Sequence, residues 1–168
     1  MSRILGIDPG SRATGFGVVD ADGARLVYLA SGVIRTSGDF GPRLRTIFLE
    51  LQQVIGEYRP DGVAVEQVFV QRNVASALKL GQARGVAICA AAVLDMTVAE
   101  YAPRTIKLAL TGSGAADKDQ VQQMVRQLLG LRGSLQEDAG DALAVAICHA
   151  QQQRLDAGLR AATTGLGQ

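Results

Sequence analysis

The chain has 168 residues, of which 48% are hydrophobic and 20% charged, so it is long enough for about one domain with a sizeable apolar core. The formal net charge of +1 excludes a polybasic protein and gives no electrostatic signal for nucleic acid, although a basic face balanced by an acidic pocket would give the same sum. The longest apolar run, 86–94, is shorter than the roughly 18 residues that a membrane span needs. Cys89 and Cys148 lie in apolar runs without metal-type spacing, so we expect buried free thiols in a reducing cytoplasm.

The first part of the chain has the pattern of an antiparallel meander. Apolar runs at 4–7 and 15–19 predict two strands, and turn-forming residues follow them at 8–10 and 20–23. A third strand is predicted over 26–34. Because the second turn ends in Asp-Gly, we expect a tight hairpin between the second and third strands.

Helical and strand patterns alternate in the rest of the chain. The predicted elements are, in chain order, a helix from 42 to 55, a strand at 63–65, a helix over 75–94, a strand at 97–99, a short helix over 103–110, a capped helix from 117 and a last helix over 137–155. This order predicts an α/β protein with a mixed five-stranded sheet, in which an antiparallel meander and parallel strands are flanked by helices. We expect one domain over 1–155 and a disordered tail over 156–168, which is small, polar and aperiodic.

Four acidic side chains occupy positions that such a sheet could bring together. Asp8 ends the first strand and Glu66 the fourth, while Asp138 and Asp141 lie three residues apart on one face of the last helix. Clustered carboxylates repel each other, and a pair of hard divalent cations such as Mg²⁺ removes that repulsion. Two such ions can activate water and stabilise the leaving oxygen in phosphodiester cleavage. The structural alternative is a turn-capping Asp8 and a solvated first turn of the last helix.

Longer motifs, in the same order along the chain, resemble one known family. The segments ILGIDPGS (4–11), VEQVF (65–69), SALKLGQARG (76–85) and DAGDALA (138–144) resemble the sequence blocks of the RuvC Holliday junction resolvases. The resemblance implies an RNase H-like fold and a homodimeric cytoplasmic endonuclease for four-way DNA junctions. Such an enzyme nicks two strands of like polarity symmetrically and leaves ligatable 5′-phosphate ends.

The same resemblance implies roles for individual residues and partners. Asp8, Glu66, Asp138 and Asp141 correspond to the family's metal ligands, which hold two Mg²⁺ ions per active site, with Mn²⁺ as a substitute. The RuvA and RuvB branch-migration proteins are the implied protein partners.

Several residues are candidates for contact with DNA. Phe69 corresponds to an aromatic side chain that stacks on a base near the junction centre, and Lys107 and Lys118 correspond to basic residues near the scissile phosphate. Arg72 is a further candidate on a positive track that Lys79, Arg84 and Arg104 could extend. Without the resemblance, Phe69 is more typical of an ordinary core residue and the lysines of a solvated surface.

Two glycines and the single histidine of the chain have alternative readings. Gly81 and Gly85, four residues apart, favour the close approach of another element, either the dimer partner that the resemblance implies or the chain's own sheet. His149 directly follows Cys148, but the chain has no other His and no further Cys near it in sequence, so a structural or surface role is expected.

Two rival functions fit parts of the sequence. The turn at 8–10 with Thr14 and Gly15 also resembles the phosphate-binding hairpin of actin-like and sugar-kinase ATPases. Those folds use two such domains, which 168 residues do not accommodate, and the chain has no Walker motif. The other rival is a junction-binding module without chemistry, against which the four acids argue because carboxylates repel DNA phosphates.

Overall fold

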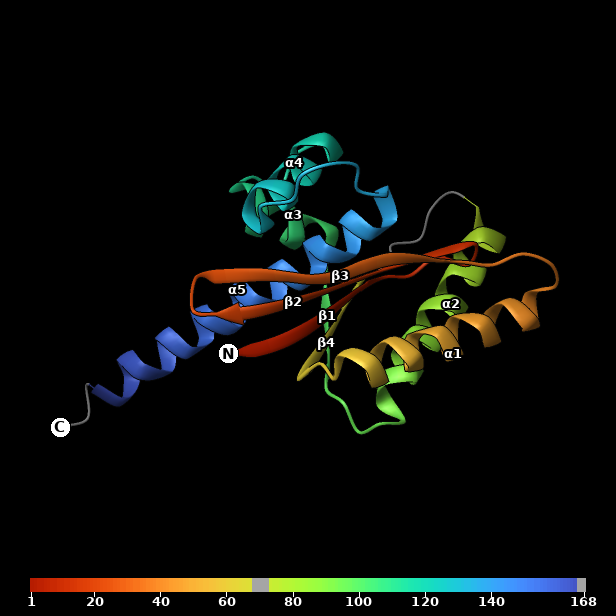
Figure 1. Cartoon of the computed structure of the whole chain (residues 1–168), viewed down its shortest axis with the longest axis horizontal. Coiled ribbons are helices and arrows are strands. Elements are labelled where there is room, and N and C mark those ends of the chain that lie inside the picture. Colours follow the sequence, from red (N-terminus) through yellow and green to blue (C-terminus); the bar gives the residue numbers. More distant parts are fainter. Residues whose placement is uncertain (68–72, 166–168) are drawn as a thin grey trace.

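The computed structural model describes residues 1–67 and 73–165, and its centre is a five-stranded sheet (Figure 1). The strands are β1 (Ser2–Asp8), β2 (Ala13–Asp22), β3 (Arg25–Arg35), β4 (Gly62–Glu66) and β5 (Val98–Tyr101). Their order in the sheet is β3-β2-β1-β4-β5, with β1, β2 and β3 antiparallel and with β4 parallel to both β1 and β5. The mixed sheet predicted from the sequence is therefore confirmed.

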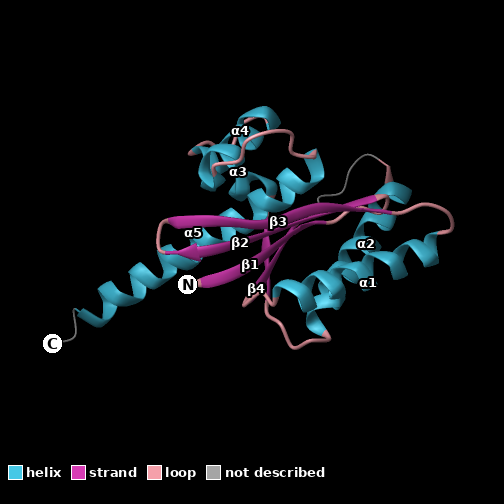
Figure 2. Cartoon of the chain, in the orientation of Figure 1, coloured by secondary structure: helices cyan, strands magenta, loops and turns pink. Residues whose placement is uncertain are grey.

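Five helices cover the two faces of the sheet. They are α1 (Phe40–Tyr58), α2 (Val74–Ala92), α3 (Pro103–Thr111), α4 (Lys118–Leu129) and α5 (Glu137–Gly165). The helices α1 and α2 pack on one face, whereas α5 crosses the other and carries α3 and α4 on its outer side (Figures 1 and 2). In the described residues, no helix is both long and apolar enough to cross a membrane.

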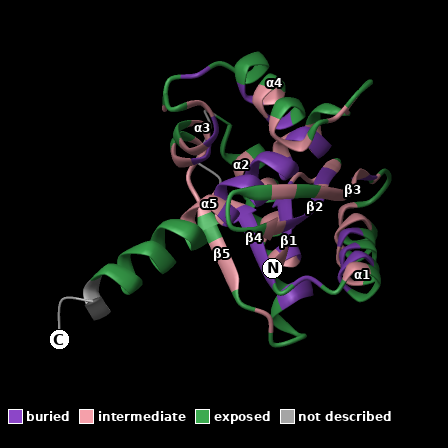
Figure 3. Cartoon of the chain, turned by 60° about the vertical axis from the view of Figure 1, so that its left-hand side comes forward, coloured by how far each residue is buried: buried purple, intermediate pink, exposed green. Residues whose placement is uncertain are grey.

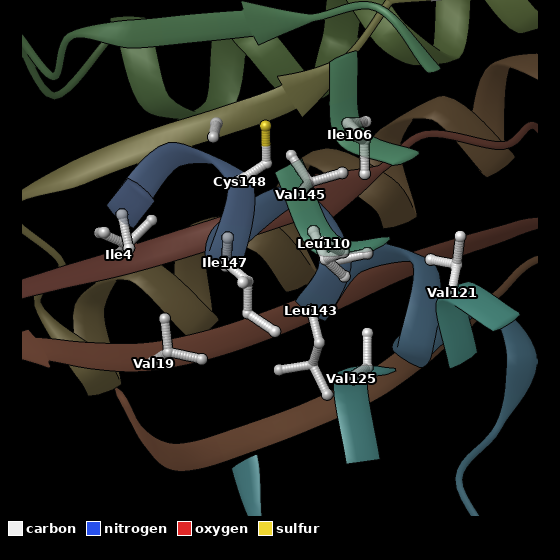
Figure 4. Close-up of a cluster of buried hydrophobic side chains, with 14 of the residues drawn as sticks. Ile4, Val19, Ile106, Leu110, Val121, Val125, Leu143, Val145, Ile147 and Cys148 are labelled. Carbon is white, nitrogen blue, oxygen red and sulfur yellow. The ribbon is translucent and has the colours of Figure 1, made fainter. Parts of the chain in front are cut away.

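Alternation along the strands divides the apolar core between the two faces. Ile4 belongs to the cluster with α5, and the adjacent Leu5 to the cluster with α1 and α2, because successive strand residues point to opposite faces. The α5 side is filled by Leu143, Ile147 and Val125 together with Ile4 (Figure 4). The buried residues follow the sheet and its two helical layers, and the last turns of α5 are exposed (Figure 3).

The first turns of α5 lie unusually close to the sheet, at glycine positions. A Cβ atom at Gly15 would lie 1.9 Å from the backbone oxygen of Asp138, and one at Gly6 would lie 2.1 Å from that of Ala142. Any side chain at either position would therefore push α5 outward. The glycines of β1 and β2 therefore set how closely α5 approaches the sheet, at whose edge the candidate residue Asp8 lies.

Two local predictions differ from the structure: the start of the turn at 20–23 and the burial of Cys89. The predicted turn at 20–23 begins too early, since β2 continues to Asp22. Asp20 is buried within the strand and forms a salt bridge with Arg3, with 2.8 Å between Arg3 Nε and Asp20 Oδ1. Cys148 is buried as expected, but Cys89 is exposed, because it lies with Val74 and Leu78 on the face of α2 that the chain's own core does not cover.

The end of the chain also differs from expectation. The last helix continues past the predicted boundary at 155, and residues 156–165 are helical rather than irregular. This segment contains Ala157, Leu159, Arg160 and Ala161, which are good helix formers. Intrinsic propensity therefore extends α5 where the absence of an apolar periodicity predicted a tail.

Candidate active site

The sheet brings the first two candidate acids to one edge. Ile7 of β1 pairs with Val65 of parallel β4, so the next residues, Asp8 and Glu66, end neighbouring strands at the same level. Asp138 and Asp141 lie in the first turns of α5, directly above this edge, because α5 packs on β1 and β2 from the same end. The fold thus gathers the acids from three elements that are far apart in sequence.

The acids and two predicted lysines line one cavity of about 380 Å³. Lys107 of α3 and Lys118, the first residue of α4, face the carboxylates across this cavity. The remaining lining residues are Pro103, Ile106, Val121 and Ala144. A cavity lined by both carboxylates and ammonium groups suits a site that holds cations and a phosphate together.

Burial and mutual repulsion keep part of the acidic cluster protonated. Burial, the carboxylates of Glu66 and Asp141, the hydrogen bond with Glu66 and the charge of Asp138 raise the pKa of Asp8 to about 8. Burial also raises the pKa of Glu66, while the hydrogen bond with Asp8 and the charges of Lys118 and Lys107 oppose this rise. Asp8 and Glu66 therefore share a proton near neutral pH when no cation compensates their charge.

Lys118 compensates the charge at the other side of the cavity. Its Nζ atom lies 3.0 Å from Asp141 Oδ2 and also forms an ion pair with Glu137. Burial alone would lower the pKa of Lys118, but the hydrogen bonds to Glu137 and Asp141 outweigh it and raise that pKa. The helix α4 begins with a capping box in which the Asp117 side chain accepts from the Gln120 N–H and the Gln120 side chain accepts from the Asp117 N–H. This capped turn fixes the origin of the Lys118 side chain.

The chemistry of these donors fits hard divalent cations. Among the described residues, no three His, Cys, Asp or Glu side chains already stand in a metal-binding group. Lys118 holds one oxygen of Asp141, and a hydrogen bond joins Asp8 to Glu66, so three of the four carboxylates already have partners within the protein. The ligands are nevertheless all oxygen atoms around one cavity, which is the donor set that Mg²⁺ and Mn²⁺ prefer.

One residue at the site has no signal that marked it in the sequence. The side chain of Gln122 donates to Asp141 Oδ1 over 2.7 Å, and also approaches the backbone oxygen of Glu137. Gln122 lies one helical turn after Lys118, so both side chains leave α4 on the same face. The four-residue spacing from Lys118 could have indicated Gln122, but only after Lys118 itself had been placed in the site.

The other predicted residues have varied positions. Phe69 and Arg72 lie outside the described residues. Arg84 forms an ion pair with Glu100, so its charge is already compensated.

His149 lies inside the protein rather than at the cavity. Its Nδ1 atom lies 2.7 Å from the Tyr101 hydroxyl oxygen, and its Nε2 atom lies 3.0 Å from Gln153 Nε2. Burial lowers the pKa of His149. These contacts link α5 to β5, which agrees with the structural role expected for this residue.

Comparison with known proteins places the chain in a family. Residues 4–149 match the family model for the crossover junction endodeoxyribonuclease RuvC. The chain belongs to the RuvC family. The RuvC of Psychromonas ingrahamii is 58% identical over 151 residues, which cover 89% of this chain and 87% of that protein. The RuvC of Vibrio cholerae is 56% identical over 155 residues, which cover 92% of this chain and 90% of that protein.

A solved structure of the RuvC family has the same architecture. It is Thermus thermophilus RuvC in complex with Holliday junction substrate, with a TM-score of 0.87 and 35% identity over 93% of this chain and 97% of that chain. The predicted membership of the RuvC family and the RNase H-like fold are therefore confirmed.

Proposed function

We propose that this chain is a metal-dependent endonuclease that resolves four-way DNA junctions, with Asp8, Glu66, Asp138 and Asp141 as its catalytic and metal-binding residues. The observation that carries the proposal is the single cavity in which all four carboxylates meet Lys107 and Lys118. Membership of the RuvC family and the Holliday junction bound by the Thermus thermophilus relative support the choice of substrate.

The four carboxylates are the groups that would hold two Mg²⁺ ions, or Mn²⁺ in their place. When bound, divalent cations neutralise these carboxylates and the phosphate, and supply an acidic water for in-line attack. The fold of the chain holds the four carboxylates in fixed positions relative to one another. Asp8 and Glu66 are fixed by adjacent strands, whereas Asp138 and Asp141 are fixed by a helix whose height depends on Gly15.

The lysines complete the site for a phosphodiester. Lys107 projects from α3 and Lys118 from the first turn of α4, so a phosphate in the cavity would meet two ammonium groups opposite the carboxylates. The positive end of the α4 dipole adds to the attraction. Lys118 would exchange Asp141 for the phosphate as the site fills. We propose Phe69 as a further DNA contact on the strength of the family resemblance, and Arg72 as a further DNA contact on a positive track beside it.

The outward face of α2 supports a homodimer, which would set two cavities for symmetric nicking. The residues Val74, Leu78, Gly81, Gly85, Cys89 and Val93 recur at helical spacing, and all are exposed. Leu78 is 65% exposed, and a Cβ at Gly81 or Gly85 would meet no other atom within 4 Å. These glycines therefore do not pack on the chain's own sheet. An exposed apolar stripe with small residues at its centre suits a second copy of the same helix. RuvA and RuvB remain proposed partners by resemblance.

A cleavage assay on labelled strands tests the catalytic proposal. A synthetic four-way junction and a plain duplex are incubated with the chain, with Mg²⁺ or with EDTA. We expect paired nicks on opposing strands of the junction only, and only with Mg²⁺. Asp8→Asn should bind the junction normally and lose cleavage, whereas Asp22→Asn, at the far end of β2, should cut normally. Cleavage by Asp8→Asn at the normal rate would remove the acids from the mechanism.

A further inference from the structure

Gln122 of α4 contacts the first turns of α5 through a single amide group. Its Nε2 atom lies 2.7 Å from Asp141 Oδ1 and 3.2 Å from the backbone oxygen of Glu137. The other oxygen of Asp141, Oδ2, faces the ammonium group of Lys118. The two oxygens of this carboxylate are therefore distinguished: one accepts from a neutral amide and the other faces a cation.

We propose that Gln122 is a positioning residue for Asp141, which holds Oδ1 by hydrogen bonding so that Oδ2 is presented to a divalent cation. This inference rests on the proposed function, because it takes Asp141 to be a metal ligand. The amide is neutral, so it can remain in place when a cation binds, whereas Lys118 must give way to like charge. Gln122 and Lys118 thus have opposite effects on the same carboxylate.

The orientation of the amide is fixed by its two acceptors. With the amide reversed, its oxygen would face Asp141 Oδ1 and the backbone oxygen of Glu137, and acceptor would oppose acceptor at both contacts. In the observed orientation Oε1 is buried and has no hydrogen-bond partner among the residues that the structure describes. An unpartnered buried oxygen is unfavourable in itself. The contact with Asp141 therefore outweighs that cost and decides which way the side chain points.

Gly140 provides the space for this side chain. A Cβ atom at Gly140 would lie 2.0 Å from Gln122 Oε1 and 2.6 Å from Nε2. Glycine is a poor helix former, yet Gly140 stands inside an otherwise alanine-rich stretch of α5, between the two acids. The close approach of Gln122 accounts for a glycine at this position. Gln122 and Gly140 thus form one contact between α4 and α5.

Hydrogen bonds behind a metal ligand fix the orientation of that ligand. Their loss commonly weakens metal binding by about 10–100-fold. Without Gln122, the Asp141 carboxylate would be free to rotate about its χ angles, and Lys118 would be its only remaining side-chain hydrogen-bond donor among the contacts described for it. Binding of a cation would then have to order the carboxylate as well as displace the lysine.

The test compares Gln122→Leu with Gln123→Leu, a matched change at the next, exposed position of α4. Mn²⁺ binding to the full chain is measured by titration calorimetry without DNA, and junction cleavage is measured against Mn²⁺ concentration. We expect Gln122→Leu to bind Mn²⁺ about 10–100-fold more weakly and to shift the cleavage midpoint by the same factor, with the plateau rate reduced less than about three-fold. Gln123→Leu should match the wild type in both.

Gly140→Ala supplies an independent variant that leaves the amide in the sequence but displaces it. It should weaken Mn²⁺ binding in the same direction, and it decides the question if thermal melting shows Gln122→Leu to be misfolded. Wild-type affinity retained in a folded Gln122→Leu or Gly140→Ala would overturn the inference and leave the proposed function standing. Failure of the wild type itself to bind Mn²⁺ would instead overturn the proposed function.

Discussion

Replacing Asp8 by Asn should stabilise the metal-free protein at alkaline pH. The folded state holds the Asp8 proton up to a pKa of about 8, against an unperturbed value of 3.8. Between these values the folded chain binds more protons than the unfolded chain, so the free energy of unfolding falls as pH rises. Above about pH 8 the folded cavity must carry the Asp8 charge beside those of Glu66 and Asp141. Asparagine has nearly the same shape and never carries that charge.

The size of the effect follows from the pKa displacement. A rise of roughly 4 pKa units corresponds to a limit of about 6 kcal/mol, at ~1.36 kcal/mol per unit. Because Glu66 shares the proton and the cavity admits water, we expect Asp8→Asn to gain about 2–4 kcal/mol at pH 8.5. For a chain of this length that gain raises the melting temperature by roughly 5–15 °C.

Thermal melts in EDTA at pH 5 and at pH 8.5 provide the measurement. At pH 5 about 1.2 of the roughly 4 pH units between the two pKa values have been crossed, so the stabilisation by Asp8→Asn should be about a third of that at pH 8.5. Asp22→Asn serves as the control and should match the wild type at both values. A stabilisation of the same size at pH 5 and pH 8.5 would show that charge in the cavity is not its cause. Saturating Mg²⁺ should stabilise the wild type most at pH 8.5 and so reduce the difference.

Three further substitutions test the site, the helix height and the dimer. Lys118→Met should bind Mn²⁺ about two- to five-fold more tightly in calorimetry, because a half-exposed ammonium group no longer competes for Asp141. The same variant should cut junctions at least about ten-fold more slowly. Unchanged cleavage would remove Lys118 from the reaction. Gly15→Ala should lower the free energy of unfolding, measured in urea, by about 3 kcal/mol, since its Cβ would clash with the Asp138 backbone. The control Gly56→Ala, on the open face of α1, should raise that free energy by about 0.5–1 kcal/mol. Gly85→Leu should shift the mass measured by light scattering from dimer to monomer without lowering the melting temperature of the protomer, and a retained dimer would place the interface elsewhere.

The sequence was sufficient for those parts of the site that depend on local rules. A carboxylate directly after an apolar run marks a strand end, and parallel strands place such ends at one edge, so Asp8 and Glu66 were predictable. The helical acids needed the family resemblance, because nothing local tells which end of α5 lies over the sheet edge. The contact of Asp141 with Gln122 was out of reach, since it depends on how α4 packs on α5.

The errors in the prediction have the same physical origin. Asp20 resembles a turn residue until Arg3 is known to pair with it inside the sheet. Cys89 resembles a core residue until α2 is seen to bury only one of two apolar faces. In both cases the local sequence correctly indicated a polar or an apolar side chain. Whether that side chain is buried depends on residues distant in sequence.

The long final helix offers a practical means of handling the protein. The helix α5 has 29 residues, so it spans about 44 Å at ~1.5 Å per residue, and its acids lie at the opposite end from Gly165. Its last turns extend away from the sheet (Figure 1). A dye, affinity tag or surface tether joined at Gly165 would therefore stand some 40 Å from Asp138 along the helix axis. Single molecules could be immobilised there while the cavity lined by the four acids stays accessible to long DNA.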